Sequence, residues 1–106
     1  MKIVIDNKIY DIEIYNNPIK KLMGFMFKKR IDKIICFKHC NSIHTFFMRA
    51  NITVIMTDKN LNIVHIERNM QKNKVLIKKG AYYTIELNPN LIKENSKIKV
   101  IWSERS

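Results

Sequence analysis

Glycine is nearly absent from this chain, and its scarcity excludes one large class of catalytic protein. The only glycines among the 106 residues are Gly24 and Gly80, whereas a loop that cradles a nucleotide phosphate needs several close together. We therefore expect no nucleotide-dependent catalysis. Cysteine is equally rare, since Cys36 and Cys40 stand alone. Two cysteines are too few for a disulfide scaffold, and we expect both thiols to be reduced.

Long apolar segments are also missing. Lys, Asn or Asp interrupts every apolar run before it reaches the roughly 18 residues that a membrane-spanning helix needs, so we expect no membrane span. The start of the chain, Met1 to Asp6, becomes polar too early for a signal peptide and has no small-residue cleavage site. The expected location is therefore the cytoplasm.

Acidic residues are few, because nine Asp and Glu stand against twenty Lys and Arg, a net charge of +11. Such an excess speeds encounter with nucleic acid, anionic lipid or acidic proteins without identifying a function. Sixteen of the cations are Lys, and 19 Ile and 12 Asn accompany them, a joint excess typical of AT-rich coding sequences. Beyond that bias, two local clusters predict a basic surface if the fold unites them. They are Lys20, Lys21, Lys28, Lys29 and Arg30, and Lys72, Lys74, Lys78 and Lys79.

Strand-forming sequence, by contrast, is abundant. Apolar residues make up 46% of the chain, enough for one core, and we expect one domain over residues 1–106. Alternating, β-branched segments between turn signals favour a mainly β fold (β-rich α+β), a compact antiparallel barrel or jelly-roll-like sandwich. The expected strands are Lys2–Ile5, Lys8–Tyr15, Lys33–Lys38, Ser42–Arg49, Ile52–Thr57, Asn62–Arg68, Lys74–Lys78, Ala81–Leu87 and Ile98–Trp102.

One short amphipathic helix is expected between Ile19 and Arg30. Apolar residues recur there at helical spacing, while lysines fall outside the apolar stripe. Asn17 and Pro18 are suited to the N-cap and the first helical position. Gly24 lies inside the segment, where it weakens a helix, so its presence indicates close packing against a neighbouring element.

Two further local features are predicted. In the second strand, alternation places Tyr10, Ile12 and Ile14 toward the core. Pro89, flanked by two asparagines, is expected to begin one short helical turn that runs through Lys93.

Three segments, in order, resemble the signatures of one protein family. Lys21 to Lys28 resembles an Arg-x-x-Gly-Leu-Met-x-Arg signature with Lys at both basic positions. Thr45 to Asp58 is similar to a Phe-Trp-Met-Lys-Asn stretch followed by an aliphatic strand and Asp, and Ala81 to Leu87 to an Ala-x-x-x-Leu-Glu-Leu signature. Together they resemble the bacterial and archaeal family called domain of unknown function 192. The resemblance implies an antiparallel β domain of barrel or jelly-roll type with a short helix, and it implies no reaction.

The chain departs from the family pattern at three points. Thr53 stands where the family usually carries an Asp, so a role that needs that carboxylate is in doubt. Asn90 stands where a Gly often follows Leu-Glu-Leu, a mild change because Asn tolerates a left-handed turn. Many relatives also carry an export signal, and we expect none in this chain.

The stretch from Cys36 to His44 carries the most reactive side chains. Cys36, Cys40 and His44 are spaced by four residues, so on a helix they could bind Zn²⁺ with His39 or His65 as fourth ligand. We interpret the stretch as strand, turn and strand, with ordinary thiols and imidazoles and no metal, because a second distant ligand pair is missing. A Cys-His nucleophile would also need an orienting group and an oxyanion hole, and neither is evident.

These observations favour a non-catalytic binding module for a protein or a small anionic ligand, without a cofactor. Arg49 at a strand end could anchor an anion through its planar donors, and Glu86 could pair with Arg49 or Lys21 in a structural role. The predicted binding residues lie near one rim of the fold. They are Cys40, His44, Phe47, Met48, Arg49 and Glu86.

Two alternatives stay open. The clustering of Cys40 and His44 is compatible with a metal- or thiol-dependent enzyme. The charge of +11 and the two lysine clusters are compatible with a nucleic-acid or membrane-surface binder. Single-strand binding would need exposed aromatic residues, and the sequence does not show that Phe46, Phe47, Tyr82 or Tyr83 is exposed.

Overall fold

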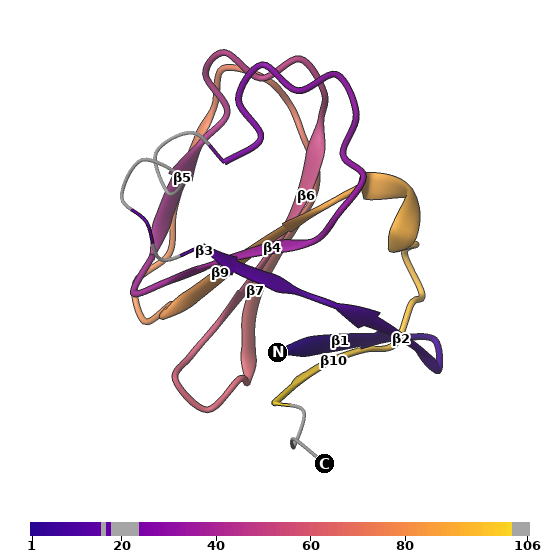
Figure 1. Cartoon of the computed structure of the whole chain (residues 1–106). Coiled ribbons are helices and arrows are strands. Elements are labelled where there is room, and N and C mark those ends of the chain that lie inside the picture. The colour runs from indigo at the N-terminus through magenta and orange to yellow at the C-terminus, as the bar shows by residue number, and fades with distance from the viewer. Residues whose placement is uncertain (16, 18–23, 103–106) are drawn as a thin grey trace.

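The structure is a computed structural model that describes residues 1–15, 17 and 24–102, and it is mainly β, as the sequence predicts (Figure 1). The elements are β1 (Lys2–Ile5), β2 (Lys8–Asp11), β3 (Glu13–Tyr15), β4 (Ile35–Lys38), β5 (Ser42–His44), β6 (Ile52–Thr57), β7 (Ile63–Met70), β8 (Val75–Ile77), β9 (Tyr83–Leu87), the 3₁₀ turn η1 (Pro89–Leu91) and β10 (Ile98–Ile101). Strand β1 alternates between buried and less buried residues, whereas β6 and β9 are buried along their whole length.

The strands form three sheets. The largest has the order β3-β4-β9-β6-β7, a second has the order β10-β1-β2, and β5 pairs with β8 alone. Every pairing is antiparallel except that of β3 with β4. Over the described residues β3 and β7 remain the two edges of the largest sheet, so no closed barrel forms.

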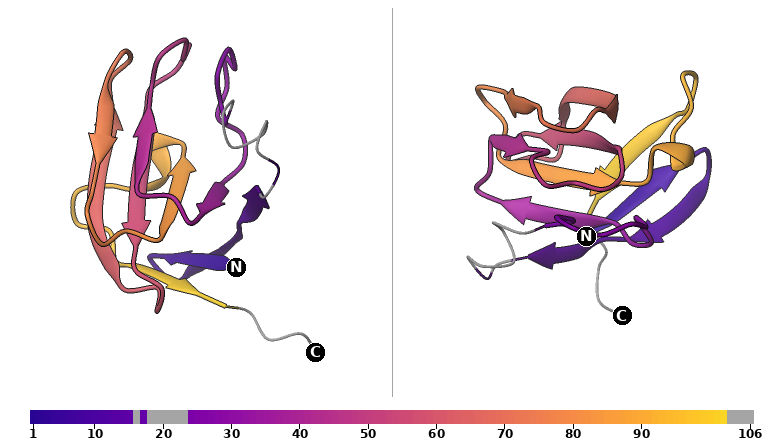
Figure 2. Two further views of the ribbon diagram at one scale, coloured as in Figure 1. Left: turned by 90° about the vertical axis from the view of Figure 1, so that its left-hand side faces the viewer. Right: turned by 90° about the horizontal axis from the view of Figure 1, so that it is seen from above.

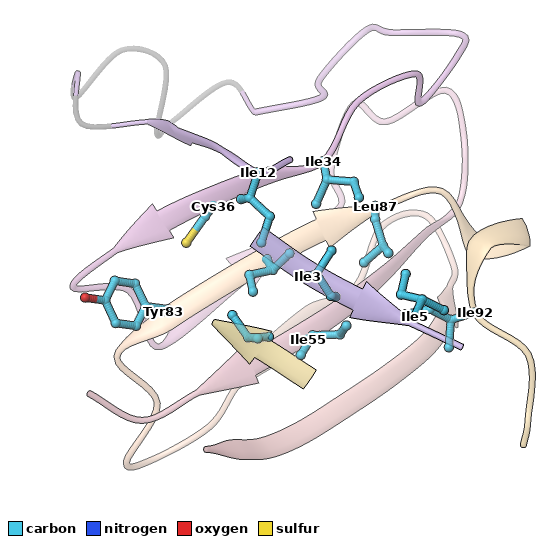
Figure 3. Packing of buried hydrophobic residues seen from close by; sticks show 11 residues of the cluster. Ile3, Ile5, Ile12, Ile34, Cys36, Ile55, Tyr83, Leu87 and Ile92 are labelled. Atoms are coloured by element: carbon cyan, nitrogen blue, oxygen red, sulfur yellow. The ribbon is translucent and has the colours of Figure 1, made fainter. Parts of the chain in front are cut away.

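Two hydrophobic clusters cover the two faces of the largest sheet. Residues that alternate along β4 and β6 divide between them, as the two-residue period of a strand requires. Tyr83, Ile85 and Leu87 join the first cluster, where Ile3 and Ile5 of β1 pack across the sheet (Figure 3). The second cluster is built from aromatic, methionine and β-branched side chains. It includes Tyr15, Phe25, Ile31, Ile35, Phe37, Ile43, Met48, Ile52, Val54, Met56 and Met70.

Two predicted strands are too long. The segment Lys8–Tyr15 divides at Ile12 because β2 pairs with β1 while β3 pairs with β4. Ile12 is buried and Tyr10 and Ile14 pack against the first cluster, so the predicted inward face is confirmed. The segment Ser42–Arg49 is a strand only to His44, after which the chain turns.

The predicted helix Ile19–Arg30 is wrong over its second half. Residues 18–23 lie outside the described residues, and from Gly24 to Phe27 the chain forms a turn. Gly24 has a φ of 48° and Phe27 a φ of 65°, values that a right-handed helix does not contain. The described half of the segment is a loop that buries Phe25 in the second cluster.

The short helical turn after Asn88 is confirmed, although η1 ends at Leu91. Asn88 caps it, because its side-chain oxygen accepts the Asn90 N–H at 2.8 Å. In the described part of the chain, no helix has the length and apolar character needed to cross a membrane.

Candidate binding surface at the three-loop end

Three loops meet at one end of the molecule, and we call this region the loop end. It comprises residues 24–30, 45–50 and 71–74, which form the three tips at the top of the left-hand view in Figure 2. The opposite end holds the three-stranded sheet of β10, β1 and β2. The loop end thus gathers segments far apart in sequence, among them parts of both predicted lysine clusters.

Hydrogen bonds tie the three loops to one another. The Phe27 N–H donates to the Phe47 carbonyl at 3.0 Å, which joins the first loop to the second. Thr45, buried at 1% exposure, joins the second loop to the third. Its hydroxyl donates to the Gln71 carbonyl at 2.7 Å and accepts the Lys74 N–H at 2.8 Å. These hydrogen bonds therefore hold the three loops together in the absence of a partner.

Three phenylalanine side chains are exposed at the loop end. Phe27, Phe46 and Phe47 are 57%, 41% and 64% exposed. The rings of Phe27 and Phe47 lie 5.8 Å apart at 35°. Both residues have left-handed backbones, with φ of 65° and 63°. A bulky side chain in that conformation stores strain, and such strain concentrates at functional sites.

The charge of the loop end has one sign. Six cations in its loops are exposed, and these described loops contain no Asp or Glu. Like charges held together repel one another and create a positive potential that attracts an anion. The six are Lys28, Lys29, Arg30, Arg49, Lys72 and Lys74.

The predicted site residues divide between the surface and the core. Phe47 and Arg49 are exposed at the loop end, whereas Met48 between them is buried in the second cluster. Glu86 is also buried, at 5% exposure. The structure therefore does not gather all six predicted residues into one surface.

Glu86 is buried and takes part in no ion pair among the described residues. Its predicted partner Arg49 is exposed, Lys21 lies outside the described residues, and no ion pair among those described involves Glu86. Burial raises the pKa of its carboxyl group to about 8, so the side chain is mostly neutral at pH 7. A Cβ added at Gly24 would lie 3.1 Å from Phe37 Cζ and 3.4 Å from Glu86 Oε1. Gly24 thus lets the first loop close over this carboxyl group.

Cys40 and His44 engage backbone groups. The Cys40 thiol donates to the Ser42 carbonyl at 3.1 Å, and His44 Nδ1 accepts the Phe46 N–H at 3.2 Å. The His44 ring stacks on Phe46, with centroids 5.4 Å apart. His44 therefore contributes to the aromatic border of the loop end.

The spacing of four from Cys36 to His44 does not create a metal site, because the stretch is not helical. Cys36 is buried in the first cluster, where burial raises the pKa of its thiol to about 12. Within residues 1–15, 17 and 24–102, no three His, Cys, Asp or Glu side chains are grouped so that they could hold a metal ion. The zinc alternative, with His39 or His65 as fourth ligand, is wrong for the described residues.

Thr53, at the position of the family's Asp, has a structural partner. It is 1% exposed, and its hydroxyl accepts the Asn69 N–H at 3.1 Å where the β6–β7 register shifts. We expect Thr53→Val to lower the free energy of unfolding by about 1 kcal/mol, because that N–H loses its acceptor. Urea denaturation would measure the loss, with Thr53→Ser as control. Equal stability of the Val and Ser variants would contradict this role.

Sequence reasoning missed Phe27 and Thr45 as parts of the site. Phe27 lies in the segment predicted to be helical, next to the lysines of the first cluster, and a helix gave no reason to expose it. Thr45 follows the end of β5, and nothing local in the sequence indicates that its partners lie in residues 71–74.

Comparisons with known proteins agree with the fold. The model of a family described as DUF192, an "Uncharacterized ACR", matches residues 1–100. No curated protein gives a significant match. A crystal structure of a protein of unknown function from Novosphingobium aromaticivorans has a TM-score of 0.71 at 14% identity, covering 93% of this chain and 84% of that one. A protein from Sinorhizobium meliloti, described as a "putative transcription regulator", has a TM-score of 0.73 at 11% identity, covering 92% and 89%. At such identities the likeness shows the fold alone.

Proposed function

The chain belongs to the DUF192 family, whose description assigns no activity. From the surface of this chain, we propose that it is a non-catalytic module that binds an anionic partner at the loop end. One observation carries the proposal. Three exposed phenylalanines stand among six exposed cations, and the described loops that present them contain no carboxylate. Surfaces that combine apolar anchors with one sign of charge are typical of binding sites.

The state of the thiols supports a binding role over thiol catalysis. A nucleophilic cysteine acts as the thiolate, which needs a lowered pKa and a base within hydrogen-bond reach. The pKa of Cys36 is raised, and the Cys40 thiol donates a hydrogen bond to the Ser42 carbonyl. His44 Nδ1 meanwhile accepts a backbone N–H. The enzyme alternative built on Cys40 and His44 therefore has no activated pair to support it.

The bracing of the loops also supports binding. Ordering a loop costs conformational entropy, and a loop that is already ordered avoids that cost when a partner binds. The bond from Phe27 to Phe47 and those around Thr45 hold the exposed rings and cations in place. Phe47 and Arg49, two of the predicted binding residues, would supply an apolar contact and an anion contact.

The proposal is tested with heparin as a plain polyanion. We expect the triple variant Lys28→Gln, Lys29→Gln, Arg30→Gln to elute from a heparin column at a clearly lower salt concentration than the wild type. Each lost contact removes counterion release from the binding equilibrium. The measurement is the salt concentration at the elution peak.

A variant of equal net charge is the control. Lys8, Lys97 and Lys99 are exposed in or beside the three-stranded sheet, away from the loop end. Changing them to Gln also lowers the net charge from +11 to 11 − 3 = +8. We expect this variant to elute close to the wild type. Equal shifts for the two triple variants would show that only total charge matters and would overturn the proposal.

A further inference from the structure

We infer that the partner of the loop end is the surface of an anionic lipid bilayer, with Phe27 and Phe47 inserted at the boundary between headgroups and acyl chains. This inference rests on the proposed function and names the chemistry of its partner. It follows from the shape of the surface, from the arrangement of rings and charges, and from the bracing of the loops.

The phenylalanines stand at protruding tips, not in a groove. The loops that carry them project from the sheets at one end of the molecule (Figure 2). Phe27, Phe46 and Phe47 do not line any of four cavities that are bounded by described residues. A peptide segment or a nucleic-acid base is bound best when a groove encloses it. A bilayer needs no groove, because it offers an apolar layer into which projecting rings can insert.

Cations lie close to the exposed rings along the chain, as binding to an anionic lipid surface requires. Lys28, Lys29 and Arg30 directly follow Phe27, and Arg49 lies two residues after Phe47. The third loop adds Lys72 and Lys74, and no carboxylate in these described loops offsets the six cations. An anionic bilayer presents phosphate and carboxylate groups above an apolar layer, and basic side chains beside an inserted segment bind those groups.

The chemistry of phenylalanine also favours lipid. A Phe ring has no hydroxyl or N–H that must find a polar partner, so it enters an apolar layer without leaving such a group unpaired. The rings of Phe27 and Phe47 contact each other, and the bond from the Phe27 N–H to the Phe47 carbonyl fixes their backbones. Two rings held side by side can insert together with little further loss of freedom.

Vesicle flotation with the full chain tests the inference. We expect the wild type to bind vesicles of phosphatidylcholine with one third phosphatidylserine, and to stay unbound with phosphatidylcholine alone. The double variant Phe27→Ala, Phe47→Ala should lower the partition coefficient at least tenfold, because two apolar rings are lost. The loop-end triple Gln variant should lower it about a hundredfold, at about fivefold for each cation.

The matched control removes equally exposed apolar side chains elsewhere. Ile9 and Ile77 are 64% and 69% exposed and lie outside the loop end. The variant Ile9→Ala, Ile77→Ala should bind vesicles like the wild type. Thermal melts of all variants separate loss of binding from loss of folding, since each change is made at an exposed side chain.

Insertion is measured directly with a Trp at position 47. In Phe47→Trp, acyl chains brominated near the headgroup should quench additional fluorescence, while the native Trp102, far along the chain in the three-stranded-sheet region, should be quenched little. Vesicle binding with no added quenching would mean electrostatic adsorption without insertion, and would overturn the inference.

Other partners are outcomes of the same experiments. A single-stranded oligouridylate and polyglutamate are titrated beside the vesicles. Strong binding to either one with no vesicle binding would overturn the lipid inference while the proposed anion-binding module stands. Failure to bind heparin, oligouridylate, polyglutamate and anionic vesicles would overturn both.

Discussion

The variant Glu86→Gln is expected to keep its stability between about pH 4.5 and pH 8, a range over which the wild type is expected to become much less stable. Glu86 is buried in the core, and burial raises the pKa of its carboxyl group from 4.5 to about 8. The folded protein therefore keeps a proton that the unfolded chain has already released. Because Gln cannot ionise, the substitution removes this difference.

The sign follows from linkage between proton binding and folding. Below about pH 4.5 Glu86 is protonated in both states, and its full contribution to stability is present. As the pH rises toward 8 the unfolded state loses the proton first, so the free energy of unfolding falls by about 1.4 kcal/mol per pH unit. The fall ends once the folded carboxyl group ionises near pH 8. Its total, roughly 5 kcal/mol, is a large share of the stability of a small domain.

Urea denaturation at pH 5, 6.5 and 8 measures this dependence. We expect Glu86→Gln to lie within about 1 kcal/mol of the wild type at pH 5 and to exceed it by several kcal/mol at pH 8. Glu94 is exposed, so Glu94→Gln should follow the wild type at every pH. The lowered pKa values of Asp6, Asp11 and Asp58 act at acid pH, outside this range. A wild type with equal stability at pH 5 and 8 would disprove the role of Glu86.

The β elements were predictable because their signal is local. Alternating or continuous β-branched segments between turn residues placed most strands, including the fully buried β6, since the signal for a strand lies in its own residues. The division at Ile12 was not predictable in this way. Both β2 and β3 keep the same alternation, and the change of sheet depends on pairing with β1 and β4, which lie elsewhere in the chain.

The prediction of a helix between Ile19 and Arg30 was wrong over its described half for a related reason. A loop can also bury an apolar residue of such a segment, and between Gly24 and Arg30 the buried residue is Phe25. Two features favour glycine at position 24, because its backbone is left-handed and a side chain there would press on Phe37 and Glu86. Close packing at Gly24 was predicted, although it occurs in a turn instead of a helix.

The candidate site was half predictable. Phe47 and Arg49 could be identified because their residue types suit apolar and anion contacts, whatever the fold. Met48 and Glu86 could not be excluded, because only the structure shows that both are buried. The three signature segments nonetheless meet in space. Gly24 contacts Phe37 and Glu86, and Met48 shares the second cluster with Phe37. Much of the family pattern in this chain thus serves the core beneath the loop end.

Thr45→Val is expected to weaken the fold and the loop end together. Val has nearly the shape of Thr but lacks the hydroxyl, so the bonds to the Gln71 carbonyl and the Lys74 N–H are lost. Thr45 is 1% exposed, so its own site offers water little access. We expect the free energy of unfolding to fall by about 2 to 3 kcal/mol, since two hydrogen bonds are lost at a buried side chain. The urea midpoint, at an unchanged m-value, measures this loss.

The same substitution should also reduce vesicle binding, although Thr45 itself is buried. Without the hydroxyl, residues 71–74 lose their side-chain bonds to Thr45 and keep the backbone bonds from the Thr45 N–H to the Lys74 carbonyl and from the Asn73 N–H to the Thr45 carbonyl, so Lys72 and Lys74 are held less firmly at the loop end. Hydrogen exchange at the Lys74 amide should accelerate, because its acceptor is the Thr45 hydroxyl. Thr45→Ser keeps the hydroxyl and should preserve both protection and binding. If Val retained slow exchange at Lys74 and full stability, the bracing assigned to Thr45 would be wrong, because only its hydroxyl separates it from Val.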